Sequence, residues 1–81
     1  MNINLPANYT LLACFHIVNS RGSIILVESP EGYNGKEFVV WRYNRDAGER
    51  YWGRYFNNYS DAVLTFSEKL LQYVNGAGEN N

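Results

Sequence analysis

A stripe of apolar residues near the C-terminal end of the chain recurs every three or four positions, which is the spacing of one face of a helix. The stripe consists of Tyr59, Ala62, Val63, Phe66, Leu70, Tyr73 and Val74. Asn58 or Ser60 can cap the start of this helix, and Asn75-Gly76 is a typical stop. Because the preceding segments have strand-forming patterns instead, we expect one terminal helix to cover a sheet.

Four runs before this helix are rich in β-branched and aromatic residues and are separated by turn signals. We predict strands over residues 9–18, 23–27, 37–43 and 50–56. The segments between them, 19–22, 29–35 and 46–48, supply the Gly, Pro, Asn and Asp residues of turns and loops. The predicted fold is therefore α+β, a four-stranded antiparallel β-meander with one C-terminal α-helix packed on one face.

The length of the chain sets the number of domains. A chain of 81 residues buries about 60% of its open-chain surface on folding, which is enough for a single modest core. A composition of 46% hydrophobic and 19% charged residues is that of a globular protein. We expect one domain over residues 1–75, followed by a flexible Gly/Asn-rich tail at 76–81.

Charge and cysteine content limit the kinds of partner, metal site and cellular location that we expect for this chain. Seven Lys and Arg against eight Asp and Glu give a net charge of −1, so the overall charge does not attract nucleic acid or an anionic membrane. A single cysteine, Cys14, excludes an intrachain disulfide, and with the single histidine, His16, it excludes a classical zinc site. The N-terminus lacks the features of a signal peptide. We expect a cytoplasmic protein without cofactor, metal or membrane contact.

The sidedness of the second hairpin follows from its turn. A three-residue turn closed by Gly48 would place Trp41 opposite Gly53 and Tyr43 opposite Tyr51, on a face without charge. A large ring over a cross-strand glycine shields bare backbone. We therefore expect this face to pack under the helix. The outward face would then carry Phe38, Val40, Arg42, Arg50, Trp52, Arg54 and Phe56.

The first hairpin can be assigned in the same way. If Asn19 pairs with Ser23, then His16 lies opposite Leu26, and Cys14 lies opposite Glu28. The purely apolar face of this hairpin is expected inside. It consists of Leu11, Ala13, Phe15, Ile17, Ile25 and Val27. The other face is expected to meet solvent, the long loop, a second copy of the chain or a partner.

The strongest local feature of the predicted outward face is its combination of arginine and tryptophan. Arginine over an indole ring gains roughly 0.5–1 kcal/mol at an exposed site. Trp and Arg also dominate the hot spots of protein interfaces. A solvated face on which arginine stems shield the tryptophan is the structural alternative. The predicted binding residues are Arg42, Arg50, Trp52 and Arg54, with His16 on the neighbouring hairpin.

These patterns predict a small non-enzymatic protein-interaction module that uses the outer sheet face, with a protein partner or a second copy in a homodimer. Single-stranded nucleic acid binding by the same face is one alternative, because bases stack on aromatic rings. The net charge of −1 argues against it, as do Glu31, Glu37 and Glu49 near these strands. A further alternative is a phage or mobile-element protein that binds and inhibits a host protein.

Cys14 and His16 share one face of a strand, and Glu28 could join them there. A Cys–His–carboxylate set is typical of thiol nucleophiles. However, same-side neighbours on a strand lie about 6–7 Å apart, and the sequence has no glycine-rich oxyanion loop beside them. A structural cysteine is therefore the preferred interpretation, and we do not expect an enzyme.

Leu64 and Leu71 lie on the flank of the helical stripe. Two interpretations are open: the sheet edge or a loop covers them, or they form a small contact with another protein.

Overall fold

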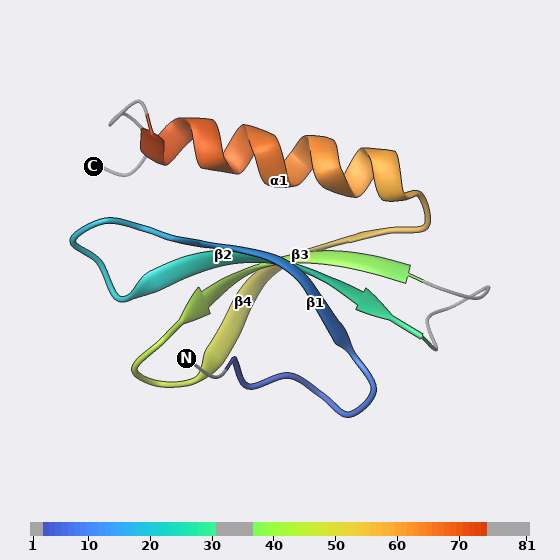
Figure 1. Cartoon of the computed structure of the whole chain (residues 1–81), viewed down its shortest axis with the longest axis horizontal. Helices are drawn as coiled ribbons and strands as arrows, with labels where there is room; N and C mark the ends of the chain where they lie inside the picture. Colours follow the sequence, from blue (N-terminus) through green and yellow to red (C-terminus); the bar gives the residue numbers. More distant parts are fainter. Residues whose placement is uncertain (1–2, 31–36, 75–81) are drawn as a thin grey trace.

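A computed structural model describes residues 3–30 and 37–74. Its elements in chain order are β1 (Thr10–His16), β2 (Gly22–Ser29), β3 (Glu37–Asn44), β4 (Glu49–Phe56) and α1 (Tyr59–Val74). The strands form one antiparallel sheet in the order β1-β2-β3-β4, and α1 crosses one face of it (Figure 1). The predicted α+β meander with one C-terminal helix is confirmed. The predicted tail, the helix stop and most of the 29–35 loop lie outside the described residues.

Helix α1 begins at the predicted cap. The Asn58 side-chain oxygen accepts hydrogen bonds from the backbone N–H groups of Ser60, at 2.8 Å, and Asp61, at 3.2 Å. The Asp61 carboxylate lies in the first turn, where the helix dipole favours negative charge. Ala62 and Phe66 are buried against the sheet, so the predicted apolar stripe is the packed face. No helix within residues 3–30 and 37–74 has the length and apolarity needed to span a bilayer.

The helix covers the faces of β2, β3 and β4 opposite to those predicted, whereas Ala13, Phe15 and Ile17 of the first hairpin lie on the helix side as predicted. The cluster beneath it contains Ile17, Ile24, Leu26, Val40, Ala62 and Phe66. Trp52, expected outside, packs against this cluster, so the expectation that the Trp41 face lies under the helix is wrong. Half-buried Phe38 and Phe56 add apolar area here. Arginine does not prevent this packing, because the Arg42 guanidinium carbon lies over the aromatic ring of Tyr73 at 5.5 Å.

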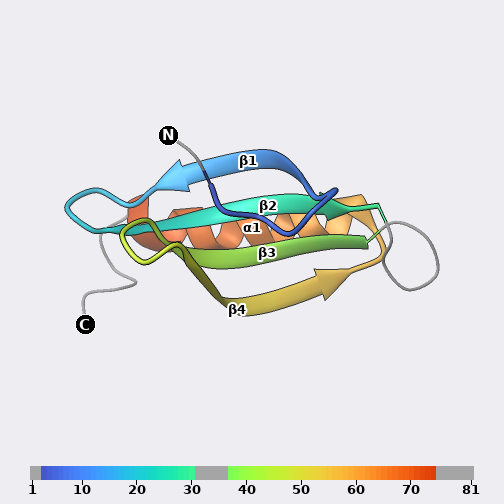
Figure 2. The same cartoon turned by 90° about the horizontal axis from the view of Figure 1, so that it is seen from below.

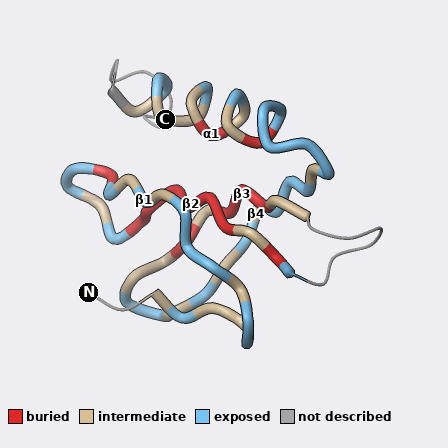
Figure 3. Tube along the Cα trace, turned by 45° about the vertical axis from the view of Figure 1, so that its right-hand side comes forward, coloured by how far each residue is buried: buried red, intermediate tan, exposed pale blue. Residues whose placement is uncertain are grey.

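The other face of the sheet is covered by the N-terminal segment. Its cluster contains Ile25, Val27, Val39, Trp41 and Tyr43, with Ile3 and Leu5 packed against it. The ring of Tyr9 stacks on Trp41 with centroids 5.9 Å apart, and the backbone N–H of Asn4 donates to the Tyr43 hydroxyl at 2.8 Å. Figure 2 shows this segment crossing the sheet on the side away from α1. The centre of this face is therefore not open, contrary to expectation, and burial is concentrated in β2 and β3 (Figure 3).

The pairing of β3 with β4 agrees with prediction at one end and differs at the other. Val40 pairs with Arg54 as expected, whereas Arg42 pairs with Tyr51 instead of Trp52. A β-bulge in β4 accounts for this change of register between Val40 and Arg42. Trp52 lies in the bulge and has a left-handed backbone conformation with φ 62°. Because of this bulge, Tyr51 and Trp52 lie on the helix side together instead of alternating.

Gly53 completes the bulge beneath the ring of Trp41, as predicted. A Cβ atom at Gly53 would lie 2.9 Å from the Trp41 Nε1 atom and 3.0 Å from the ring of Tyr55. The shifted register carries Arg50 to this face, where its guanidinium carbon lies 5.1 Å from the centre of the Trp41 ring. Trp41 is therefore buried among Tyr9, Arg50 and Tyr55, and a side chain at position 53 would force the Trp41 ring to shift.

The register of the first hairpin differs from prediction. The backbone N–H of Ile17 donates to the Gly22 carbonyl oxygen at 3.0 Å, so residues 18–21 form the turn. His16 pairs with Ser23 and not with Leu26. The shift is an odd number of residues, which exchanges the two faces of β2. Leu26 consequently lies under α1.

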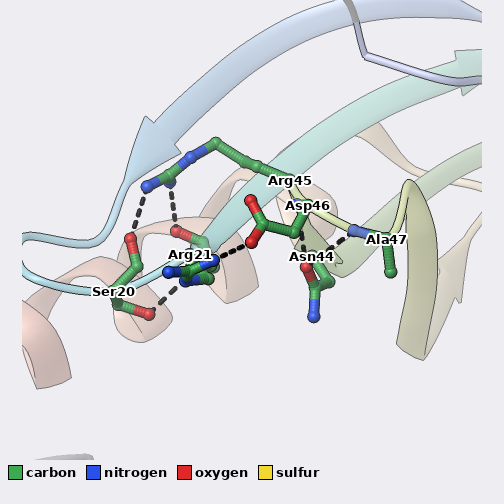
Figure 4. Close-up of polar contacts among 7 residues, drawn as sticks. Ser20, Arg21, Asn44, Arg45, Asp46 and Ala47 are labelled. Carbon is green, nitrogen blue, oxygen red and sulfur yellow. Dashed lines mark hydrogen bonds and ion pairs between the residues drawn. The ribbon is translucent and has the colours of Figure 1, made fainter.

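The two hairpin turns lie beside each other and are joined by Arg45 (Figure 4). The Arg45 guanidinium donates to the Gly22 carbonyl oxygen at 2.6 Å, to the Ser23 hydroxyl at 2.9 Å and to the Ser20 carbonyl oxygen. Its backbone N–H donates to the Arg21 carbonyl oxygen at 2.8 Å. The Ser23 side chain is fully buried, so this charge-assisted bond satisfies an oxygen that water cannot reach.

Replacing Arg45 with alanine should lower the free energy of unfolding by about 2–3 kcal/mol, because it removes charge-assisted hydrogen bonds to three acceptors. Arg21→Ala is the matched control. It breaks an ion pair with Asp46 whose side chains are 73% and 55% exposed, and should cost less than about 1 kcal/mol. Urea unfolding of both variants measures the difference, and equal losses would contradict the role given to Arg45.

Gly53→Ala should lower the free energy of unfolding by about 1–3 kcal/mol, since the added methyl group overlaps Trp41. The penalty should shrink when the same change is made in a Trp41→Leu background, which removes the obstructing Nε1 atom. A double-mutant cycle by urea unfolding tests this. An unchanged penalty in the second background would show that the indole is not the obstacle.

Candidate functional site

A groove with a volume of about 280 Å³ runs between β4 and α1. Its lining residues are Trp52, Arg54, Thr65, Glu68, Lys69 and Gln72. The helix residues are three or four positions apart, so they share the flank of α1 that borders β4. The groove therefore unites two predicted binding residues with a helix flank that the sequence did not single out.

Trp52 lines this groove and has an unusual backbone conformation. A φ of 62° is an outlier for a bulky residue and costs on the order of 1–3 kcal/mol. The Lys69 ammonium nitrogen lies 4.3 Å from the centre of the indole ring, and the Arg54 guanidinium carbon lies 5.3 Å from it. Two cations thus contact one half-buried ring that the bulge holds on the helix side.

The groove is locally cationic. Arg54 and Lys69 outweigh Glu68 by one charge, in a chain whose net charge is −1. The Lys69 ammonium contacts the Gln72 side-chain oxygen at 3.5 Å, and in the described ranges Arg54 has no hydrogen bond or ion pair. Most donor groups of the two cations are therefore available to an anionic ligand next to the indole.

The remaining predicted arginines lie elsewhere. Arg42 is half-buried under α1, over the ring of Tyr73. Arg50 lies on the opposite face over Trp41, and it donates to the carbonyl oxygen of Asn4 at 2.6 Å. The predicted group of three arginines and one tryptophan is thus divided between the two faces of the sheet.

His16 lies on edge strand β1, far from the groove in the strand order. Its Nδ1 atom is 2.8 Å from the Ser23 hydroxyl and 3.7 Å from the Cys14 sulfur. Cys14 pairs with Ile25, not with Glu28 as predicted. Alternation along β2 places Glu28 on the helix face, so the Cys–His–carboxylate set is not assembled.

The Cys14 thiol is not activated. Partial burial of the thiol of the exposed Cys14 raises its pKa above the ordinary value, and this outweighs the lowering by the hydrogen bond to Ser23 and by the charge of Arg45. A raised pKa leaves less thiolate at neutral pH, the reverse of what a nucleophile needs. Among the residues that the structure describes, no three His, Cys, Asp or Glu side chains are placed to hold a metal ion.

Sequence reasoning missed Thr65, Glu68, Lys69 and Gln72 because the wrong sheet face was placed under the helix. Their signal was present as polar residues spaced by three and four along one helix flank. The two leucines of the opposite flank are exposed, so the interpretation in which the sheet edge or a loop covers them is wrong for the described ranges.

No protein-family model, no curated protein and no solved structure matches this chain.

Cys14 should react with iodoacetamide more slowly at neutral pH than a peptide of residues 11–17, because its raised pKa lowers the thiolate fraction. The pH profile of the rate should have its midpoint above that of the peptide. Ser23→Ala removes a bond that lowers the pKa, so it should move the midpoint further up. A midpoint below that of the peptide would contradict this assignment.

Proposed function

We propose that the protein is a non-enzymatic protein-interaction module that binds a carboxylate-bearing segment of a partner in the β4–α1 groove. The observation that carries this proposal is the left-handed Trp52, whose indole is contacted by both Lys69 and Arg54. Strained conformations of this kind are concentrated at functional sites. The predicted roles of Trp52 and Arg54 are kept, while the site moves from the outer sheet face to the helix side.

The size and chemistry of the groove support this class of ligand. Its volume of about 280 Å³ is below the roughly 300–1,000 Å³ of small-molecule pockets, so it suits one or two side chains. Trp and Arg are the residues that most often anchor protein interfaces. An aspartate or glutamate could place its carboxylate between the two cations and its stem on the indole.

Single-stranded nucleic acid is less well suited to this site. Nucleic acid binding needs a positively charged track with successive stacking rings. Here one indole is bordered by two cations and by Glu68, in a chain with a net charge of −1. The raised pKa of Cys14 supports the non-enzymatic part of the proposal. One cysteine suits a reducing compartment, and we propose a cytoplasmic location.

Selection from a displayed library of random peptides tests the proposal without a known partner. We expect the enriched peptides to carry Asp or Glu beside an apolar residue. Arg54→Gln and Lys69→Gln should each weaken binding of a selected peptide about tenfold, the effect of losing one charge-assisted hydrogen bond. Arg50→Gln is the matched control, because it removes a similar cation–indole contact, at 5.1 Å, on the other face.

Two outcomes would overturn the proposal. Enrichment without acidic residues, or equal weakening by Arg50→Gln and Lys69→Gln, would remove the groove as the binding site. Tighter binding of an oligothymidylate than of the selected peptides at physiological salt, lost in Arg54→Gln, would replace the protein partner by nucleic acid. Circular dichroism of each variant verifies that the fold is retained.

A further inference from the structure

We propose that a second copy of the chain pairs with the free edge of β1, antiparallel and centred on Phe15, so that two sheets join into one. Strands β1 and β4 are the edges of the sheet, and β1 forms its border in Figure 2. This seam lies at the edge opposite the β4–α1 groove. The inference therefore does not depend on the function proposed for that groove.

The two edges differ in how well they are protected. Natural edge strands avoid pairing by means of charged side chains, proline or bulges. Strand β4 carries Glu49, Arg50 and Arg54 together with the bulge at Trp52. Strand β1 contains no Lys, Arg, Asp, Glu or Pro, and most of its residues are exposed. Strand β1 has a register shift of its own at Leu12, but its pairing with β2 is regular from Ala13 to His16, so this second half is the edge open to another strand.

Hydrogen bonding fixes which backbone groups that edge offers. The N–H of Ile17 points into the sheet, because it donates to the Gly22 carbonyl oxygen at 3.0 Å. Backbone groups alternate in direction along an antiparallel strand. The N–H and C=O groups of Cys14 and His16 therefore point away from β2, toward the free edge.

These directions determine the register with a second copy. A two-fold axis through Phe15 places Cys14 opposite the partner's His16, where each residue both donates and accepts a backbone hydrogen bond. The same axis brings Leu12, at the register shift of β1, near the partner's Val18, the first residue of the 18–21 turn, since both lie three positions from Phe15. Leu12 is 39% and Val18 77% exposed. The edge is thus complementary to itself, which identifies the occupant as a second copy of this chain.

The proposed dimer can be tested by measuring its molar mass and by changing the apolar side chains at the two ends of the seam. The molar mass should rise with concentration from 9.3 kDa toward twice that value, as measured by sedimentation equilibrium. A seam of this length buries less than the roughly 1,600 Å² of a standard interface, so we expect a dissociation constant in the micromolar range. Val18→Lys and Leu12→Lys place lysines at the seam and should each weaken the dimer tenfold or more.

Leu64→Lys and Leu71→Lys are the matched controls, because these leucines are 57% and 56% exposed on the helix, away from β1. They should leave the dissociation constant unchanged. A monomer at every concentration would overturn the proposal, as would a dimer weakened by the helix variants and not by the β1 variants. Val18→Lys should also leave peptide binding at the groove intact, which separates the two proposals.

A disulfide tests the register directly. In His16→Cys, Cys14 would face the new cysteine of the partner, with Cα atoms about 5.5 Å apart in a hydrogen-bonded pair, inside the range that a disulfide spans. Oxidation should give a covalent dimer in which mass spectrometry finds position 14 linked to position 16 of the other chain. Adding Val18→Lys should suppress this product. Linkage of position 14 mainly to its own counterpart would overturn the register.

Discussion

The contact of the Trp41 indole with Gly53 determines how the second half of the sheet is built. The ring lies so close to the backbone that a side chain at position 53 would displace it. Asn44 pairs with Glu49, so the turn before β4 is one residue longer than the predicted three-residue turn. The bulge at Trp52 compensates for this extra residue, so that Val40 pairs with Arg54 as predicted. The extra turn residue and the bulge that compensates for it thus go with the position of Trp52 on the helix side, where the candidate site lies.

Coverage of both faces of the sheet explains how a chain of 81 residues makes two apolar clusters with one helix. Helix α1 covers one face, and the N-terminal segment covers the other through Leu5 and Tyr9. The central strands β2 and β3 are consequently buried along most of their length. The surfaces left for contact are the margins of the sheet, which is why the groove is at β4 and the free backbone is at β1.

Local signals were sufficient for the elements of the fold. The apolar spacing in α1, the Asn58 cap and the contact of the Trp41 ring with Gly53 all follow from neighbouring residues, and each is confirmed. The two faces depended on whether a turn holds an odd or even number of residues. Residues 18–21 form a longer turn than the one predicted, and that difference exchanged the two faces of β2. Composition offers no signal for such a difference.

The choice of face failed for a reason that also explains the candidate site. The lack of charge on the Trp41 face predicts that this face packs under the helix, yet arginine can bury its stem and keep its guanidinium at the margin of a core. Arg42 is half-buried over Tyr73, and the exposed Arg54 lies against the ring of the half-buried Trp52. Charge on a strand therefore indicates where a packed face ends, not that the face is open. Trp52 and Arg54 mark such a boundary, where an apolar ring and unpaired donors are available to the same ligand.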